Sequence, residues 1–550
     1  MDVRLSEWKN DLILSENDKQ HTYWMLDDTH FSRPLTPLFA SFMLPAVTAG
    51  TKRAFENMKL PIVQFITKSD HGYYYQSAPA HPEPFEERMA RHKEKMSAFY
   101  PRIKSYMEGI VSESLMPFYR KLMDRSTRVL SRQEALQYVQ ELESFYTKAW
   151  QHHFEITFSR MSLLIELEAL YGQVTGEPHT KKVFELMQGT MNMSLETDRG
   201  LWLLAEQVKS SELLRSALQE SGDLLDRLHD TAEGREFVKE LRDFLSIYGH
   251  RTALTHEFTD ETWYENPSYA LSIIMNYVDK DYDFDKEFKQ AVADRTARAE
   301  VWLNSLPQGE MTNRLIEVYH WALDCWGVDE DHHFYIDAMI AAKSRYFLKN
   351  VGRTLVQEQV LATEEDIFYL YLDDLLEALR EPRALHEVVK HHKCEHYEYR
   401  KRRPEPFFGT PPKLPPDPMI ERIFGVLQEA IQEPTMTLRG YAASAGTYRG
   451  KVKVIWGQED FAKLTTGDIL VCRTLTPPWT VLFPIAGALI TDAGGILSHA
   501  SIVAREYRLP AVVGTKRATS CLQDGDEVTV DGTVGVVHMH AAESRGFGPG

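Results

Sequence analysis

A proline-rich segment separates two parts of the chain with different sequence patterns. Seven of the seventeen residues from 402 to 418 are proline. Proline lacks a backbone N–H and restricts the residue before it, so neither a helix nor a central strand can run through such a stretch. We predict a semi-rigid linker with one further helix over residues 404–437. A chain of 550 residues is also too long for one hydrophobic core, so several domains are expected.

The part before the linker has the pattern of a helical domain. From residue 84 to residue 403, apolar residues recur at steps of three and four with charges between them, as in the segments that begin at Phe85, Arg132 and Arg295. This periodicity predicts amphipathic helices packed in a bundle. Residues 1–83 mix turn signals with short β-rich runs, such as the one that starts at Leu60. We assign them to a mixed N-terminal segment of the same domain.

The part after the linker has the pattern of a small α/β domain. Between residues 438 and 541, short β-branched runs alternate with turns built on glycine and aspartate, and one helix is expected over residues 500–507. Residues 542–550 form a tail. The predicted fold class is therefore α+β and multidomain, with a large, mostly helical domain followed by a small β/β/α domain.

Composition narrows the classes of partner. The formal net charge of −18 disfavours a general binder of nucleic acid, whose phosphates would be repelled. No apolar run approaches the roughly 20 residues that span a bilayer, and the polar N-terminus has no secretory character. We therefore expect a cytoplasmic protein with no membrane or nucleic-acid partner. The four cysteines form no CxxC pair, which suggests neither a disulfide framework nor a zinc ribbon.

One short motif carries the clearest chemistry. A predicted strand ends at Gly494 and Gly495, which allow a tight turn, and Ser498 is a natural N-cap for the helix that follows. His499 would then lie at a helix N-terminus, where free N–H groups and the helix dipole favour anions. The same dipole disfavours imidazolium and keeps the ring nucleophilic, which suits covalent phosphoryl transfer. The alternative is a capping serine followed by a chance histidine.

The stretch around this motif resembles the phosphohistidine domain of the PEP-utilising enzyme family. The family pattern of GG, SHA, ARE and PAVVG stands here between residues 494 and 514. The resemblance implies that His499 carries phosphate on a swivelling domain, and that Gly494, Gly495, Ser498 and Arg505 belong to its site. One departure is Ala445, which stands where the family usually has the proline of a Ser-Pro-Gly turn.

The first 403 residues resemble the acceptor-binding parts of related enzymes. Segments at residues 30–42, 244–268 and 329–370 are similar to rifamycin phosphotransferase and to the alpha subunit of phenylphosphate synthase. Related two-chain dikinases that act on hydroxyphenyl ketones have the same division of labour between subunits. The resemblance implies transfer of phosphate to a phenolic hydroxyl, with AMP and phosphate as the other products. No GxxxxGK[ST] loop is present, so ATP and Mg²⁺ should act mainly through a separate ATP-grasp subunit. The alternatives are a rifamycin-like acceptor and a non-catalytic phosphocarrier.

Phosphorylation of a hydroxyl requires cations near the phosphoryl group and a base for the proton. The candidate acceptor-side residues are His30, Arg33, His250, Arg251, His332, His333, Tyr335, Lys343 and Arg345. The structural alternative is that the cations are solvated and the histidines are structural. Five aromatic residues could line an aromatic pocket, although core packing is the commoner role: Trp24, Tyr73, Tyr74, Tyr75 and Phe334.

One further histidine-rich segment resembles a metal site. His391, His392, Cys394 and His396 lie within a charged stretch before the linker. No second cluster of ligands has the usual spacing. We predict a solvated helix here and assign no metal-binding residues.

Overall fold

The computed structural model describes residues 11–28, 30–177, 181–219, 224–252, 256–278, 282–411, 437–475, 477–495 and 498–540. The chain forms two compact units, each described here by itself. Unit 1 comprises residues 1–170, 255–260 and 314–414, and unit 2 comprises residues 171–254, 261–313 and 415–550. This division differs from the expected boundaries, because helices between residues 193 and 278 share a hydrophobic core with the C-terminal β-rich part.

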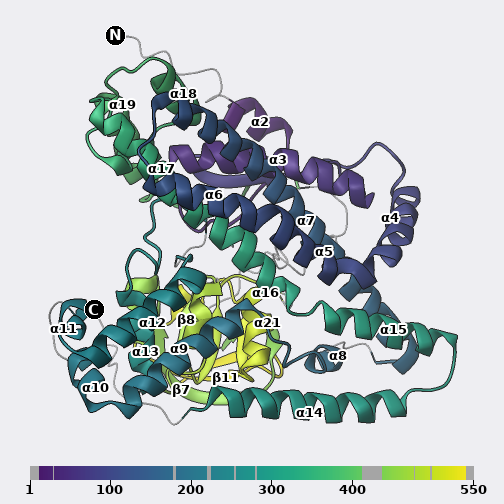
Figure 1. Cartoon of the computed structure of the whole chain (residues 1–550). Coiled ribbons are helices and arrows are strands. Elements are labelled where there is room, and N and C mark those ends of the chain that lie inside the picture. Colours follow the sequence, from purple (N-terminus) through teal and green to yellow (C-terminus); the bar gives the residue numbers. More distant parts are fainter. Residues whose placement is uncertain are drawn as a thin grey trace, which may run out of the picture. The chain divides into compact units, whose positions relative to one another are not determined.

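Unit 1 is built on long helices (Figure 1). Helix α7 (Arg132–Thr175) begins in this unit, and α17 (Met339–Gln357) packs against α6 (Met116–Thr127). The other helices are α2 (Glu16–His21), α3 (Pro37–Met58), α4 (Phe85–Phe99), η1 (Tyr100–Arg102), α5 (Ile103–Ile110), η2 (Val111–Leu115), α15 (Glu310–Asp324), α16 (Val328–His332), η3 (His333–Ala338), η4 (Glu364–Tyr369), α18 (Leu372–Arg380) and α19 (His386–Tyr399). The expected helical segments at Phe85 and Arg132 are present.

Helix α3 was not expected within the N-terminal mixed segment. It contains Pro45, and most of its side chains are buried on every face, so it lacks the amphipathic pattern by which a helix is recognised. Gly50 lies where a side chain could not fit, because a Cβ atom there would stand 2.8 Å from the backbone nitrogen of Gln151 on α7. Close packing between α3 and α7 therefore explains both the glycine and the missing pattern.

A four-stranded sheet completes unit 1, in the order β2 (Ile66–Asp70), β3 (Tyr73–Ser77), β1 (Trp24–Leu26) and β4 (Phe407–Phe408). His71 and Gly72 join β2 to β3 with φ angles of 48° and 78°, the left-handed geometry of a tight hairpin. Strand β4 lies at the sheet edge, within the proline-rich segment, where a strand can lack donors. The remainder of the predicted linker and its helix lies mostly outside the described residues.

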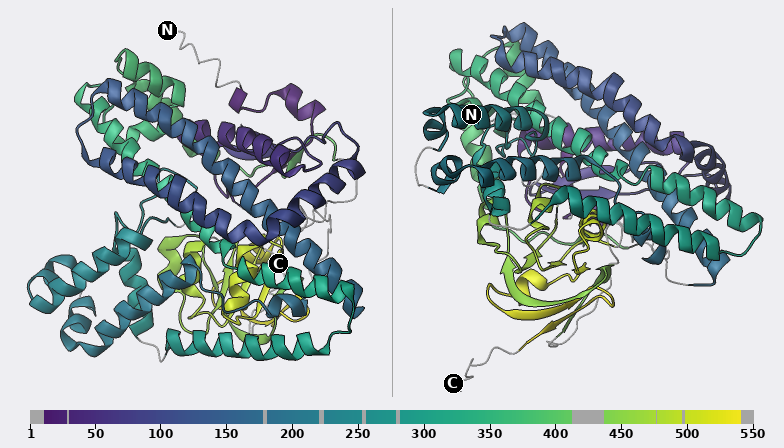
Figure 2. Two further views of the ribbon diagram at one scale, coloured as in Figure 1. Left: turned by 45° about the vertical axis from the view of Figure 1, so that its right-hand side comes forward. Right: turned by 60° about the horizontal axis from the view of Figure 1, so that its bottom comes forward.

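Unit 2 contains an eight-stranded sheet in the order β5-β12-β11-β7-β8-β9-β10-β6, visible as the yellow and light-green strands in the right-hand view of Figure 2. Strands β7 to β10 are parallel to one another. The strands are β5 (Thr437–Arg439), β6 (Tyr441–Ser444), β7 (Thr447–Val454), β8 (Ile469–Cys472), β9 (Ala488–Thr491), β10 (Ala511–Val513), β11 (Glu527–Asp531) and β12 (Val536–Met539). They include the β-branched runs that were predicted between residues 438 and 541. Short helices connect them: η5 (Gln458–Lys463), η6 (Pro477–Leu482), α21 (His499–Glu506) and α22 (Ala518–Cys521). We call this part the β-domain.

Helices of unit 2 cover one face of the β-domain. They are α8 (Lys181–Glu185), α9 (Met193–Ser210), α10 (Glu212–Gln219), α11 (Leu224–His229), α12 (Ala232–Tyr248), α13 (Ser268–Val278) and α14 (Phe284–Ser305). Side chains of α9, α12 and α13 form one hydrophobic cluster with Trp479, Leu489 and Val503 of the β-domain. A second cluster, which includes Val452 and Val528, lies within the β-domain itself. The fold is α+β and multidomain, as predicted.

None of the described helices is both long enough and apolar enough to cross a membrane.

Candidate functional site

The predicted phosphohistidine turn joins β9 to α21 in the β-domain. Gly494 has a φ of +107°, which side-chain-bearing residues rarely adopt, and a Cβ atom there would approach Ser498 Oγ to 3.0 Å. Ser498 occupies the N-cap position, and His499 is the first residue of α21. The turn therefore presents the backbone of His499 at a helix N-terminus, as the sequence predicts.

The capping prediction for Ser498 is only partly correct. Its side chain makes no hydrogen bond to the helix backbone. Its Oγ instead lies 3.2 Å from Ser501 Oγ, and Ser501 Oγ donates to the carbonyl oxygen of Gly495 at 2.7 Å. Ser501 thus ties the glycine turn to the helix, a role that the sequence did not reveal.

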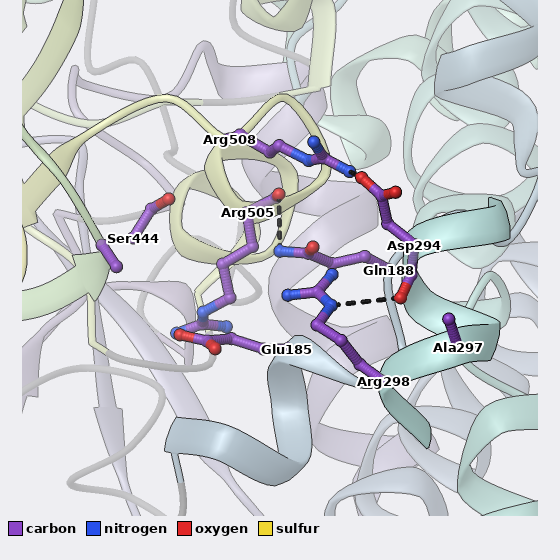
Figure 3. A pocket seen from close by; sticks show the side chains of 9 residues that line it. Glu185, Gln188, Asp294, Ala297, Arg298, Ser444, Arg505 and Arg508 are labelled. Carbon is purple, nitrogen blue, oxygen red and sulfur yellow. Dashed lines mark hydrogen bonds and ion pairs between the residues drawn. The ribbon is translucent and has the colours of Figure 1, made fainter. Parts of the chain in front are cut away.

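Arg505 lies at the other end of α21. It is six residues after His499, or about 9 Å along a helix axis. Its guanidinium is buried over the ring of Phe184, and its carbonyl oxygen accepts a hydrogen bond from Gln188 Nε2 at 2.7 Å. This end of α21 lines a cavity of about 530 Å³ that also contains Glu185, Gln188, Asp294, Arg298, Ser444 and Arg508 (Figure 3). The structure therefore places Arg505 in the contact between α21 and the unit 2 helices.

A second polar site lies in unit 1, where several helices and loops converge. It consists of imidazoles and two carboxylates: Asp27, His30, His153, His256, His332, His333 and Asp337. We call it the histidine cluster. Its members come from the loop after β1, from α7, from residues 256–260, from α16 and from η3. The π-helical turn η3 carries both His333 and Asp337, and such turns are frequent at functional sites.

Asp337 is a central group of the cluster. It is 1% exposed, with His333 Nδ1 at 2.5 Å from Oδ2 and His153 Nδ1 at 2.8 Å from Oδ1. Burial raises the pKa of Asp337, but the two imidazoles outweigh burial and hold that pKa well below its usual range. Burial lowers the pKa of His333, and its bond to Asp337 more than compensates, so that the pKa of His333 rises to about 9. The cluster is therefore a tightly coupled arrangement of charges.

His30 forms a second carboxylate–imidazole pair. Its Nδ1 lies 2.9 Å from Asp27 Oδ2, and its backbone N–H donates to Asp27 Oδ1 at 3.1 Å. The His30 side chain is 35% exposed, whereas Asp27 is buried. Burial lowers the pKa of His30, and the neighbouring Asp27 carboxylate raises it, with a net increase. Asp27 therefore orients an accessible imidazole. In general-base catalysis a carboxylate often holds the catalytic histidine in this way.

Two other imidazoles of the cluster, those of His256 and His332, are kept neutral by burial. Burial lowers the pKa of His256 to about 4 and that of His332 well below its usual range. The Nδ1 of His332 lies 3.3 Å from the carbonyl oxygen of Val328, and its Nε2 lies 3.3 Å from Thr157 Oγ1. A carbonyl oxygen can only accept a hydrogen bond, so Nδ1 of His332 carries the ring proton and Nε2 has the lone pair.

Aromatic rings pack around the cluster. Phe31 and Tyr74 are stacked with their centroids 4.4 Å apart, and the ring of His256 lies 5.3 Å from Phe31 and 5.8 Å from Trp150. Tyr74 is thus the one of the five predicted aromatic residues that stacks beside the cluster. Trp24, Tyr73 and Tyr75 belong to the core of the small sheet, and Phe334 is buried in η3.

Sequence reasoning placed His30, His332 and His333 among the candidates but missed several members of the cluster. The missed residues are Asp27, His153, His256 and Asp337, together with the ring of Trp150. His153 follows another histidine, and His256 lies twelve residues before Ser268 within a segment already singled out by resemblance. Neither signal separates these histidines from the many others, because only the packing of α7 against η3 brings them together.

The remaining acceptor-side candidates of unit 1 have structural partners. Arg33 forms an ion pair with Asp260. Arg345 donates to the carbonyl oxygen of Phe258 at 2.7 Å and pairs with Glu365. The backbone carbonyl of Tyr335 accepts a bond from the hydroxyl of Tyr119. Lys343 is buried on α17, and burial lowers its pKa to about 7.

His250 and Arg251 belong to unit 2, whereas the histidine cluster belongs to unit 1. His250 Nε2 lies 2.9 Å from the carbonyl oxygen of Ser246. Arg251 donates to the carbonyl oxygen of Tyr248 at 3.0 Å and to Thr197 Oγ1 at 2.9 Å. Both side chains therefore brace the end of α12.

The histidine-rich segment before the linker forms α19, and the prediction of a solvated helix is only partly correct. His391 and Cys394 are exposed. His392 is buried, with Nδ1 2.7 Å from the carbonyl oxygen of Tyr369, and His396 Nε2 lies 3.0 Å from the carbonyl oxygen of Pro34. One face of α19 packs on the rest of unit 1, where these two imidazoles form hydrogen bonds with backbone carbonyl oxygens.

Two protein families match segments of this chain. The family described as the mobile domain of PEP-utilising enzymes matches residues 464–535, which include the turn at His499. The family described as the fourth domain of rifampicin phosphotransferase matches residues 152–325, which include His153 and His256. These matches define a chain that combines a mobile domain with a domain of the rifampicin phosphotransferase type.

Similar curated proteins extend over most of the chain. An uncharacterised phosphotransferase of Bacillus subtilis, YvkC, is 35% identical over 98% of this chain and 64% of its own length. A rifampicin phosphotransferase of Bacillus cereus is 27% identical over 65% of this chain and 41% of its own length, and a phosphoenolpyruvate synthase of Aeropyrum pernix is 46% identical over 22% of this chain and 14% of its own length. Residues 464–535 match the mobile domain of PEP-utilising enzymes, and the sequence motifs around His499 lie within this match. The chain spans less than two thirds of the length of these relatives.

Proposed function

We propose that the chain transfers a phosphoryl group from phospho-His499 to the hydroxyl group of an aromatic acceptor at the histidine cluster. The observation that carries the proposal is the turn that places His499 first in α21, within a region matched by the PEP-utilising mobile domain. Helix N-termini favour phosphate, because their free N–H groups and dipole attract negative charge. The histidine cluster supplies the acid–base groups that a carrier alone would not need.

In the transfer step, residues of this chain account for both the phosphoryl group and the proton. The bond between phosphorus and the His499 ring breaks, and a bond forms between phosphorus and the acceptor oxygen. The hydroxyl proton passes to His30 Nε2, because Nδ1 of that ring is held by Asp27. The stacked rings of Phe31 and Tyr74 and the indole of Trp150 favour a flat, apolar acceptor.

The phosphoryl donor is ATP with Mg²⁺, bound by an ATP-grasp subunit separate from these 550 residues. That subunit would place the β-phosphoryl group of ATP on His499 and release the γ-phosphoryl group to water, so that AMP and phosphate are the products. None of the residues described above is assigned to ATP.

A phenol or a 4-hydroxyphenyl ketone is the proposed acceptor, because an acidic hydroxyl demands little of the base. A rifamycin-like acceptor is the second candidate, and the match to the rifampicin phosphotransferase domain over residues 152–325 favours it. Both acceptors use the same carrier and the same cluster, so the choice between them is a question of specificity.

Intact mass spectrometry tests the carrier step. The full chain is treated with potassium phosphoramidate, and separately with Mg-ATP and an ATP-grasp protein, before peptide mapping. We expect an acid-labile gain of about 80 Da at His499. It should be absent from His499→Ala and retained in His538→Ala, which alters an exposed histidine of the same domain. Failure of both donors to label His499 would overturn the proposal.

Transfer from the labelled chain tests the acceptor and the base. Phenol, 4-hydroxyacetophenone and rifampicin are offered in turn, and phosphorylated product is measured by mass. We expect His30→Gln to slow transfer to phenol by about 10²-fold or more, and to slow transfer to the more acidic 4-nitrophenol much less. Equal losses with both phenols would indicate a structural role for His30. Product from rifampicin alone would select the second candidate, and product from none would leave His499 as a carrier only.

A further inference from the structure

The inner part of the histidine cluster has the composition of a metal site. His153 on α7 and His332 and Asp337 on consecutive helical turns each offer one ligand atom, and these three atoms lie within 4.8 Å of one another. Two imidazole nitrogens and one carboxylate oxygen form a recurrent set for divalent transition metals that leaves further coordination positions open. This group is distinct from the histidines of α19, to which no metal was assigned.

The contact between His153 and Asp337 does not have the geometry of a satisfied hydrogen bond. Nδ1 of His153 and Oδ1 of Asp337 are 2.8 Å apart, yet neither atom has a hydrogen-bond partner of acceptable geometry among the described residues. Asp337 is 1% exposed, so bulk water does not satisfy its oxygen. Two ligand atoms about 2.0–2.1 Å from one ion stand about 2.9 Å apart at right angles and about 3.4 Å apart in a tetrahedral site. The observed separation is that of two adjacent ligands at right angles, and a tetrahedral ion would require the two side chains to move slightly apart.

Neighbouring groups form hydrogen bonds with His332 and Asp337 and orient them. Groups around the ligands of known metal sites have the same role. Nδ1 of His332 faces the carbonyl oxygen of Val328, which leaves the lone pair on Nε2. The second oxygen of Asp337 is bonded to His333, which fixes the rotation of the carboxylate. Imidazole ligands commonly donate their other ring N–H to a carbonyl or carboxylate in this way. The nearby hydroxyl of Thr157, 3.3 Å from Nε2, would have to turn away on metal binding.

We infer that His153, His332 and Asp337 bind one divalent transition-metal ion of the Zn²⁺ or Mn²⁺ type. Nitrogen-rich sets of this kind select such ions over Mg²⁺, which prefers oxygen ligands. The ion would be held by three protein ligands and would have open positions for an acceptor oxygen. Coordination would favour the deprotonated hydroxyl and would counter negative charge on the incoming phosphoryl group. This last role rests on the proposed function, whereas metal binding itself does not.

Metal binding by the full chain provides the test. Protein stripped with EDTA is titrated with Zn²⁺, Mn²⁺ and Mg²⁺ without ATP or acceptor, and bound metal is counted by elemental analysis after dialysis. We expect one Zn²⁺ or Mn²⁺ per chain and at least tenfold weaker Mg²⁺ binding. His153→Ala and Asp337→Asn should each weaken Zn²⁺ binding by about 10²-fold or more.

Matched variants separate this site from other histidines. His92→Ala alters a buried imidazole whose two nitrogens are already bonded, to the carbonyl oxygen of Met58 and to Ser162 Oγ. It should bind metal normally. The double variant His391→Ala, Cys394→Ser removes exposed ligands of α19 and should also bind normally. If Zn²⁺ binding is lost in the double variant and kept in His153→Ala, the inference is wrong.

Spectroscopy on the unaltered protein keeps the inference testable if the variants do not fold. Pulsed EPR of the Mn²⁺ form should show coupling to two imidazole nitrogens, and the Co²⁺ form should lack a thiolate charge-transfer band. No bound ion, or an ion without imidazole nitrogen, would mean that His153 and Asp337 form an ion pair only. His499→Ala should bind metal like the unaltered chain, so failure of the phosphohistidine step would not be mistaken for failure of the metal site.

Discussion

Replacement of Glu155 by glutamine would test how α7 is held in position beside the histidine cluster. Glu155 lies two residues after His153 and is 7% exposed. Its Oε1 accepts bonds from Asn57 on α3 at 2.8 Å and from Gln151 at 3.0 Å, and its Oε2 accepts a bond from Tyr106 on α5. The carboxylate therefore joins three helices through hydrogen bonds that require its negative charge.

The size of the effect follows from the pKa. Burial raises the pKa of Glu155, but His152, Tyr106, Gln151 and Asn57 outweigh burial and lower it from the ordinary 4.5 to about 2. At about 1.4 kcal/mol for each tenfold change in proton affinity, this corresponds to about 3 kcal/mol of unfolding free energy at pH 7. The folded-state pKa is depressed, so this stability is present above pH 4.5 and is lost as the pH falls toward 2. About 1.5 kcal/mol should remain at pH 3.

Amide hydrogen exchange of α7 peptides, combined with urea unfolding, measures the effect locally in a chain of two units. We expect Glu155→Gln to lower the opening free energy of α7 by about 3 kcal/mol at pH 7 and by about half as much at pH 3. Glu94→Gln on α4 changes an exposed carboxylate and should have little effect. If Glu155→Gln changes α7 equally at both pH values, or not at all, the electrostatic explanation is refuted.

Two further substitutions test a buried charge and a close backbone contact. Lys343→Met should stabilise unit 1 at pH 7, by at most roughly 4 kcal/mol, because burial lowers the lysine pKa to about 7. The gain should shrink toward pH 10, and an unchanged difference in urea unfolding would contradict it. Gly532→Ala should destabilise the β-domain by about 1–3 kcal/mol or more, because its Cβ would stand 1.9 Å from the carbonyl oxygen of Ser444. Gly109→Ala on α5 meets no atom within 4 Å and should not lower the melting temperature.

The contacts of α21 bear on any movement of the β-domain. Gly189 N–H donates to Glu506 at 2.7 Å, Tyr507 bonds to the buried Asp198, and Arg508 pairs with Asp294 at 2.7 Å. These bonds reinforce the hydrophobic core that the β-domain shares with α9, α12 and α13. A swivelling motion that carries His499 must therefore either break these contacts or move the helices of unit 2 together with the β-domain.

Local sequence patterns were sufficient for the β-domain. Its β-branched runs alternate with glycine turns, so strand positions follow from short-range rules, and the start of α21 was predicted to within one residue. The Gly494–Gly495 turn and the serine before His499 are also contiguous in sequence. Chemistry that depends on one turn can be predicted from that turn, which is why His499 could be proposed as the phosphoryl carrier from the sequence.

The histidine cluster depended on contacts between distant segments. Asp27, His153, His256 and Asp337 are separated by about a hundred residues or more from one another in most pairs, and none has a motif of its own. The sequence by itself determined the helical character of α7 and α17 and the position of the turn before His499. Only the tertiary structure decided which histidines meet, because burial beside Asp337 results from helices packing together and not from residue spacing.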